Sequence, residues 1–140
     1  HDPAVTFHEG LFMTPEAMQI LITRYFAATR AMDVEAWLAC FADDAISYDP
    51  YGAPPIQGKD ALRAFFLSVT TAFTEIGFTE DFLAVTGNRA AMKFTARGVA
   101  ANGKTATCEG IDVFEVNDGG TIQTMWGYWD PVRMMAQLEA

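Results

Sequence analysis

The spacing of apolar residues changes once along the chain, from a helical period before about residue 75 to strict alternation after it. Thr14, Pro15 and Glu16 together are typical of a helix start, because Thr caps free backbone N–H groups and Pro is tolerated at the first helical position. Apolar residues then recur at helical spacing over residues 18–29. We therefore expect a helix here, with Tyr25 on its buried stripe.

Two further helices are predicted before the period changes. Asp33 is expected to cap a short helix that ends near residues 42–44. A short strand over residues 46–49 follows and is stopped by Pro50, which opens a proline-rich loop. A third helix is predicted from residue 59 to about residue 73. The second helix is expected to turn four apolar side chains inward: Val34, Trp37, Leu38 and Phe41.

Alternation after residue 75 predicts four strands, over residues 76–85, 90–101, 104–116 and 121–129. Asn102 and Gly103 form a two-residue hairpin signal between the second and third of them. Three N-terminal helices followed by an antiparallel meander define an α+β fold in which a curved sheet wraps the helices. Such a sheet leaves a cone-shaped interior.

Asp112 lies on the apolar face of the third predicted strand. Side chains alternate across a strand, so Asp112 shares its face with Cys108 and Phe114, while Glu109 and Glu115 share the other. Burial disfavours the charged form of a carboxyl, so Asp112 is expected to be a neutral hydrogen-bond donor at neutral pH. Two other interpretations are a single misplaced polar residue and an Asp neutralised by an unseen partner.

Composition narrows the class of protein. The chain has 140 residues, 51% of them hydrophobic, which predicts one globular domain over residues 13–140. Residues 1–12 precede Met13 and are expected to be a leader or a tag. A formal net charge of −9 disfavours nucleic acid and anionic membrane surfaces as partners. No membrane-spanning or secretory segment is recognisable, so we expect a cytoplasmic protein.

Histidine occurs only at His1 and His8, both in the leader. Histidine-based triads and histidine-ligated metals are therefore disfavoured, and no metal or cofactor is expected. Carboxylates, tyrosine and lysine remain for proton transfer. Cys40 and Cys108 lie on separate elements without metal-like spacing and are interpreted as buried free thiols.

Tyr25, Asp49 and Asp112 are the polar groups expected inside an otherwise apolar cavity. Each has a structural alternative: Tyr25 as an ordinary core tyrosine with its hydroxyl at the surface, and Asp49 as turn chemistry before Pro50. Aromatic residues at helical or alternating spacing are equally typical of a core. Substrate contacts are expected from Phe41, Phe65, Phe66, Phe94, Phe114, Met125 and Trp129.

Several short motifs resemble the steroid Δ5-isomerase (ketosteroid isomerase) family of the NTF2-like, SnoaL-like superfold. Arg24-Tyr25 matches on the first helix and Ile111-Asp112-Val113 on the third long strand. The most specific motifs are Tyr48-Asp49-Pro50-Tyr51-Gly52 and the closing strand, Ile122-Gln123-Thr124-Met125 with Tyr128-Trp129. Ala42-Asp43-Asp44-Ala45 and Pro54-Pro55-Ile56-Gln57-Gly58 also match. The resemblance extends from Met13 to about Val132 and implies an NTF2-like cone.

The resemblance implies a role for each site residue. Asp49 would be the general base, Tyr25 an oxyanion hydrogen-bond donor, Asp112 its protonated companion, and Trp129 a cavity-lining residue. Ketosteroid isomerase is itself a standard example of a carboxylic acid kept neutral by an apolar site, so its agreement with the interpretation of Asp112 is not independent. The implied substrate is a hydrophobic ketone, a steroid, and the reaction needs no cofactor.

Some family members place tyrosines behind the oxyanion tyrosine, where this chain has Phe41 and Phe66. Two other functions therefore stay open: a non-catalytic binding module for an apolar or steroid-like ligand, and a SnoaL-like hydrolase or dehydratase. The latter reactions commonly use His or an Asp–Arg pair, whereas alternation places Arg97 on the outer face. The family pairs through its sheets, and outward aromatics such as Trp126 and Tyr128 predict a homodimer, unless the chain end covers them.

Overall fold

The computed structural model describes residues 13–139, and the predicted leader, residues 1–12, lies outside the described residues. The helices of this part are α2 (Pro15–Arg30), α3 (Val34–Leu38), α4 (Gly58–Thr70) and α5 (Pro131–Ala136). The strands are β1 (Phe41–Tyr48), β2 (Ile56–Gln57), β3 (Phe73–Thr86), β4 (Arg89–Ala100), β5 (Thr105–Val116) and β6 (Ile122–Tyr128).

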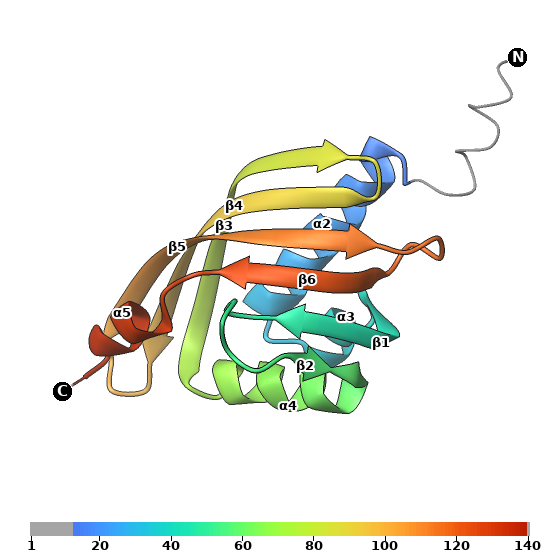
Figure 1. Cartoon of the computed structure of the whole chain (residues 1–140). Helices are drawn as coiled ribbons and strands as arrows, with labels where there is room; N and C mark the ends of the chain where they lie inside the picture. Colours follow the sequence, from blue (N-terminus) through green and yellow to red (C-terminus); the bar gives the residue numbers. More distant parts are fainter. Residues whose placement is uncertain (1–12, 140) are drawn as a thin grey trace, which may run out of the picture.

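All six strands form one curved sheet in the order β2-β1-β6-β5-β4-β3. Neighbours are antiparallel except β1 and β6, which run parallel. The sheet does not close on itself. In Figure 1, α2 lies behind β4, β5 and β6, and α4 lies below β1 and β2. The fold is thus the predicted α+β cone, in which helices fill the concave side of a mainly antiparallel sheet.

The helix starts agree with their sequence signals. The Thr14 side chain accepts a hydrogen bond from the Ala17 N–H at 3.1 Å, and Asp33 caps α3 by accepting from the Ala36 N–H at 3.1 Å. Such caps satisfy backbone donors that have no partner inside the helix. Tyr25 lies on the buried stripe of α2, as predicted.

The predicted second helix is too long. α3 ends at Leu38, and Phe41 is the first residue of β1, where it pairs with Ile122 of β6. The Cys40 carbonyl accepts a hydrogen bond from the Ile122 N–H at 2.8 Å. Long-range pairing therefore overrides the local helical spacing around Phe41. A short antiparallel pair between β1 and β2 also replaces part of the predicted loop.

The last three strands begin and end within one residue of their predicted limits, while β3 begins earlier, at Phe73, because α4 ends at Thr70. Gly103, in the turn between β4 and β5, has a φ of 83°, a left-handed conformation that favours glycine. Strict alternation is thus the most reliable pattern in this chain, because one face of each strand packs on the helices.

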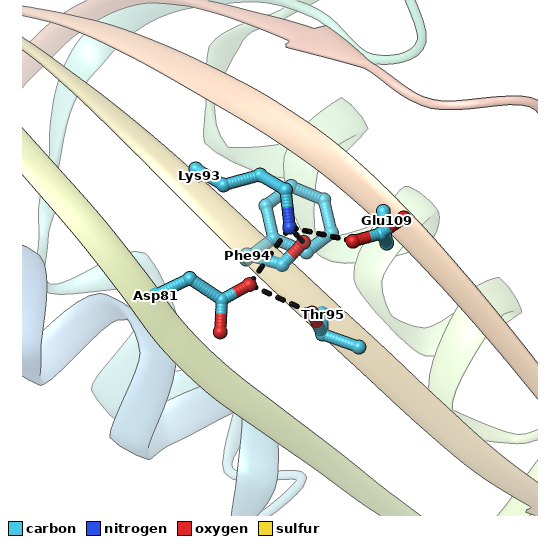
Figure 2. Close-up of polar contacts among 5 residues, drawn as sticks. All are labelled: Asp81, Lys93, Phe94, Thr95 and Glu109. Atoms are coloured by element: carbon cyan, nitrogen blue, oxygen red, sulfur yellow. Dashed lines mark hydrogen bonds and ion pairs between the residues drawn. The ribbon is translucent and has the colours of Figure 1, made fainter.

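A cluster of charged side chains ties β3, β4 and β5 together on the outer face of the sheet (Figure 2). The Lys93 ammonium donates to Asp81 Oδ2 at 2.8 Å and to Glu109 Oε1 at 2.9 Å. Asp81 is the extra residue of a β-bulge in β3 and also accepts from the Thr95 hydroxyl at 2.7 Å. Lys93 and Thr95 hold the pKa of Asp81 below its usual range. The cluster supports the sheet from outside, away from the cavity.

Candidate active site

Three polar side chains from different elements meet in one apolar cavity. Tyr25 comes from the middle of α2, Asp49 follows the last residue of β1, and Asp112 lies on the inward face of β5. The cavity measures about 120 Å³. A buried water needs about 10–15 Å³ by this measure, so the cavity holds roughly ten waters, or about 300 Å³ of liquid. That volume suits a compact organic ligand.

Asp112 points inward, as alternation predicts, and is only 4% exposed. Burial raises its pKa well above the usual value, and the nearby charge of Asp49 raises it further. Both causes favour the protonated form, because ionisation would place a second negative charge in a site with little water. Asp112 is therefore a neutral donor in a cavity that already holds one carboxylate.

Asp49 has a different environment, because a hydrogen-bond donor that favours its ionised form lies beside it. The Trp129 indole N–H donates to Asp49 Oδ1 at 2.5 Å. Burial raises the pKa of Asp49, and the hydrogen bond from Trp129 opposes this rise by stabilising the carboxylate. Of the two carboxyl groups, Asp49 is thus the one equipped to ionise first and to act as a base.

Gly127 of β6 lies directly beneath both carboxyl groups. It pairs with Asp112 across the sheet, and its carbonyl accepts a hydrogen bond from the Tyr51 N–H at 2.7 Å. A Cβ atom at this position would overlap Asp49 Oδ1 and come within 3.1 Å of Asp112 Oδ1. Both carboxyl groups therefore approach one point that only a glycine leaves open. The sequence contains a signal for this contact, a lone glycine inside a predicted strand.

Tyr25 is 6% exposed, so its hydroxyl does not lie at the surface. The hydroxyl donates to Met125 Sδ at 3.6 Å, and its ring is packed edge-on by phenyl groups. Burial raises the pKa of Tyr25 well above its usual value, and the charges of Asp112 and Asp49 act in the same direction. Tyr25 is therefore a neutral donor, and its present acceptor is a weak one.

The structure places four of the seven expected substrate-contact residues on the cavity wall. Phe65, Phe66, Phe94 and Trp129 line the cavity. Phe41, Phe114 and Met125 do not: they are almost fully buried and form the layer behind Tyr25. Alternation and helical spacing show that these residues face inward. They do not show how deep each one lies, because depth depends on the curvature of the sheet.

Several lining residues were not predicted as site residues: Thr29, Trp37, Val69, Thr70, Phe73, Ile76, Phe78, Ala96, Arg97, Gly98, Cys108 and Met134. Trp37 was expected to face inward, but only as part of the core. Met134 comes from α5, which begins with an Asp130 cap and Pro131. This helix start is recognisable in the sequence and could have predicted that the chain end folds back over the cavity.

Both cysteines are free thiols, Cys40 buried and Cys108 half-buried, and burial raises the pKa of each. Arg97 is exposed, as alternation predicts, but it is also one of the residues that line the cavity. Among residues 13–139 no group of three His, Cys, Asp or Glu side chains is placed to hold a metal ion. Over the same residues, no helix is both long and apolar enough to cross a membrane.

The comparison with known proteins agrees with this architecture. A family model described as a SnoaL-like domain matches residues 22–124. This match spans more than half of the chain, which therefore belongs to the SnoaL-like domain family.

Two solved structures have a similar fold. SalBIII, described as an epoxide hydrolase/cyclase-like enzyme with a role in pyran ring formation in the polyether salinomycin, superposes with a TM-score of 0.76 at 24% identity, covering 84% of this chain and 94% of SalBIII. RV0760c from Mycobacterium tuberculosis superposes with a TM-score of 0.75 at 26% identity, covering 86% of this chain and 96% of its own.

Proposed function

We propose that this protein is a steroid Δ5-isomerase, which moves a carbon–carbon double bond into conjugation with a ketone. One observation carries the proposal: a carboxyl suited to ionise, Asp49, shares an apolar cavity with two donors that burial keeps neutral, Tyr25 and Asp112. Proton abstraction beside a ketone needs a base and donors for the oxygen that becomes negative. The motifs around these residues support the same reaction.

The reaction would proceed in two proton transfers. Asp49 takes a proton from the carbon between the ketone and the double bond, and the electron pair shifts to form a dienolate. Tyr25 and Asp112 donate hydrogen bonds to the dienolate oxygen. Protonated Asp49 then returns the proton to the far carbon of the original double bond, which leaves a conjugated enone and regenerates the base. Met125 Sδ is a weak acceptor, so Tyr25 can exchange it for this oxygen at little cost.

The test is to incubate the purified protein with a 3-oxo-Δ5 steroid and follow the absorbance of the conjugated enone. Asp49→Asn is the matched control, because it retains the size of the side chain and removes the base. We expect turnover by the wild type and none by the variant, with binding of a phenolic steroid retained. Equal rates in the two proteins would refute the proposal. Tight phenolic binding without turnover in either would identify a binding module instead.

A second candidate, a hydrolase or cyclase acting on an epoxide, has support from the similarity to SalBIII. A neutral Asp112 could protonate an epoxide oxygen while ionised Asp49 activates the attacking hydroxyl or water. The two functions differ in their products. Mass spectrometry after incubation with an apolar epoxide would show a gain of one water for hydrolysis, an unchanged mass with a new ring for cyclisation, and unreacted epoxide for an isomerase.

We also propose that two copies pair through the outer face of the sheet. Tyr51 and Tyr128 are 63% and 47% exposed and lie together, with ring centroids 5.8 Å apart. The chain end does not cover Tyr128, whereas Trp126 is partly covered by Tyr48 and by the guanidinium of Arg89. An exposed aromatic pair is costly to leave in water. Sedimentation should show a dimer that Tyr128→Lys converts to monomer; a monomeric wild type at micromolar concentration would contradict this.

A further inference from the structure

Trp37 is a polar residue of the cavity wall to which the reaction above gives no role. It lies on α3, is 2% exposed, and lines the cavity beside Tyr25, with ring centroids 6.0 Å apart. Phe41 and Phe66 hold the indole from two sides, each with its ring centroid 4.6 Å away. The Trp37 ring is thus held in one place by its neighbours. Of the three aromatic rings that these contacts involve, that of Tyr25 is the one that carries a hydroxyl.

A buried indole N–H needs an acceptor, because leaving it unpaired costs free energy. The rings of Phe41 and Phe66 offer no oxygen or nitrogen atom, whereas the Tyr25 hydroxyl oxygen has free lone pairs while its proton is donated to Met125. Among the aromatic rings that contact Trp37, Tyr25 is therefore the one that offers an acceptor for the indole N–H.

We propose that the Trp37 indole N–H donates to the Tyr25 hydroxyl oxygen and makes Trp37 the positioning residue of the oxyanion site. The inference rests on the proposed isomerase function for its kinetic consequences, but the contact itself does not depend on that function. When Trp37 holds the Tyr25 oxygen, the O–H can turn from Met125 to the substrate oxygen that develops charge in the cavity.

The pKa of Tyr25 supports this arrangement. Burial and the two carboxyl groups raise it, while a hydrogen bond from the Trp37 side chain lowers it. A donor to the phenolic oxygen stabilises the phenolate, so it also strengthens Tyr25 as a donor to another oxygen. The Trp37 indole N–H on α3 would therefore support Tyr25 in the way that the hydroxyl of a neighbouring tyrosine could.

The experiment compares Trp37→Phe with Trp126→Phe, which makes the same chemical change on the outer face. Tyr25 is one of four tyrosines, so its titration is isolated as the difference in tyrosinate absorbance between wild type and Tyr25→Phe. We expect Trp37→Phe to raise the pKa of Tyr25, to lower kcat by about five- to tenfold, as loss of one hydrogen bond would, and to leave KM nearly unchanged. Trp126→Phe should match the wild type in all three.

A double-mutant cycle separates this role from packing. If Trp37 acts through the Tyr25 hydroxyl, Trp37→Phe has no further effect on phenolic-ligand affinity in a Tyr25→Phe background. An equal loss of affinity in both backgrounds, or an unchanged Tyr25 titration, would overturn the proposal. Absence of isomerase activity in the wild type would refute only the proposed reaction, since titration and ligand affinity still report the contact. Thermal unfolding of each variant checks that the proteins compared are folded.

Discussion

Replacing Asp112 by Asn tests whether a buried neutral acid shapes the stability of this protein. The substitution retains the size of the side chain and a donor group but removes the ionisable proton. Asp112 is 4% exposed, and its pKa is raised well above the usual value by burial and by Asp49. In the unfolded chain the same carboxyl titrates near its ordinary value of about 3.9. Wild type and variant should therefore differ in how stability depends on pH.

The sign follows from which state holds the proton. Between the unfolded and the folded pKa of Asp112, the folded protein keeps this proton and the unfolded chain has lost it. Wild-type stability should then fall as pH rises, by up to about 1.4 kcal/mol per pH unit for one proton, until Asp112 ionises in the folded state. Below pH 3.9 this contribution is fully present. Asp112→Asn lacks the contribution, so its stability relative to wild type should increase with pH.

Urea unfolding at a series of pH values from 4 to 9 measures the effect. The difference in free energy of unfolding between variant and wild type should rise along a slope approaching one proton and then level off. Asp118→Asn, in the exposed turn between β5 and β6, is the control, because it makes the same substitution outside the cavity and should leave the slope unchanged. Parallel curves for Asp112→Asn and wild type would refute the conclusion that burial keeps Asp112 protonated.

Two further predictions concern the base. Trp129→Phe removes a donor that lowers the pKa of Asp49, so this pKa should rise. Because activity requires ionised Asp49, the acid limb of the pH profile of kcat/KM should move to higher pH. An acid limb that does not move would contradict the assignment of Asp49 as the base. Gly127→Ala should push Asp49 away from Trp129 and lower kcat about tenfold or more through misplacement of the base. A crystal structure of that variant with Asp49 unmoved would refute this explanation.

The sequence by itself determined the class of fold and the direction in which most site residues point. Helix caps depend on neighbouring residues, and a strand exposes alternate side chains to the core, so α2 and the last three strands could be predicted from local patterns. The inward position of Asp112 follows from the same alternation. These features are local, and several neighbouring residues indicate each of them.

Only the tertiary structure decided which residues from distant parts of the chain come into contact. Phe41 belongs to a strand because it pairs with Ile122. Ile122 lies far along the chain, so no local sequence pattern contains that pairing. The contact of Gly127 with both carboxyl groups depends on how β1 and β5 flank β6. Trp37 became a neighbour of Tyr25 because α3 turns back against α2. Hydrogen bonds and pKa values depend on distances of a few ångströms between distant segments, and the packing of the whole chain sets those distances.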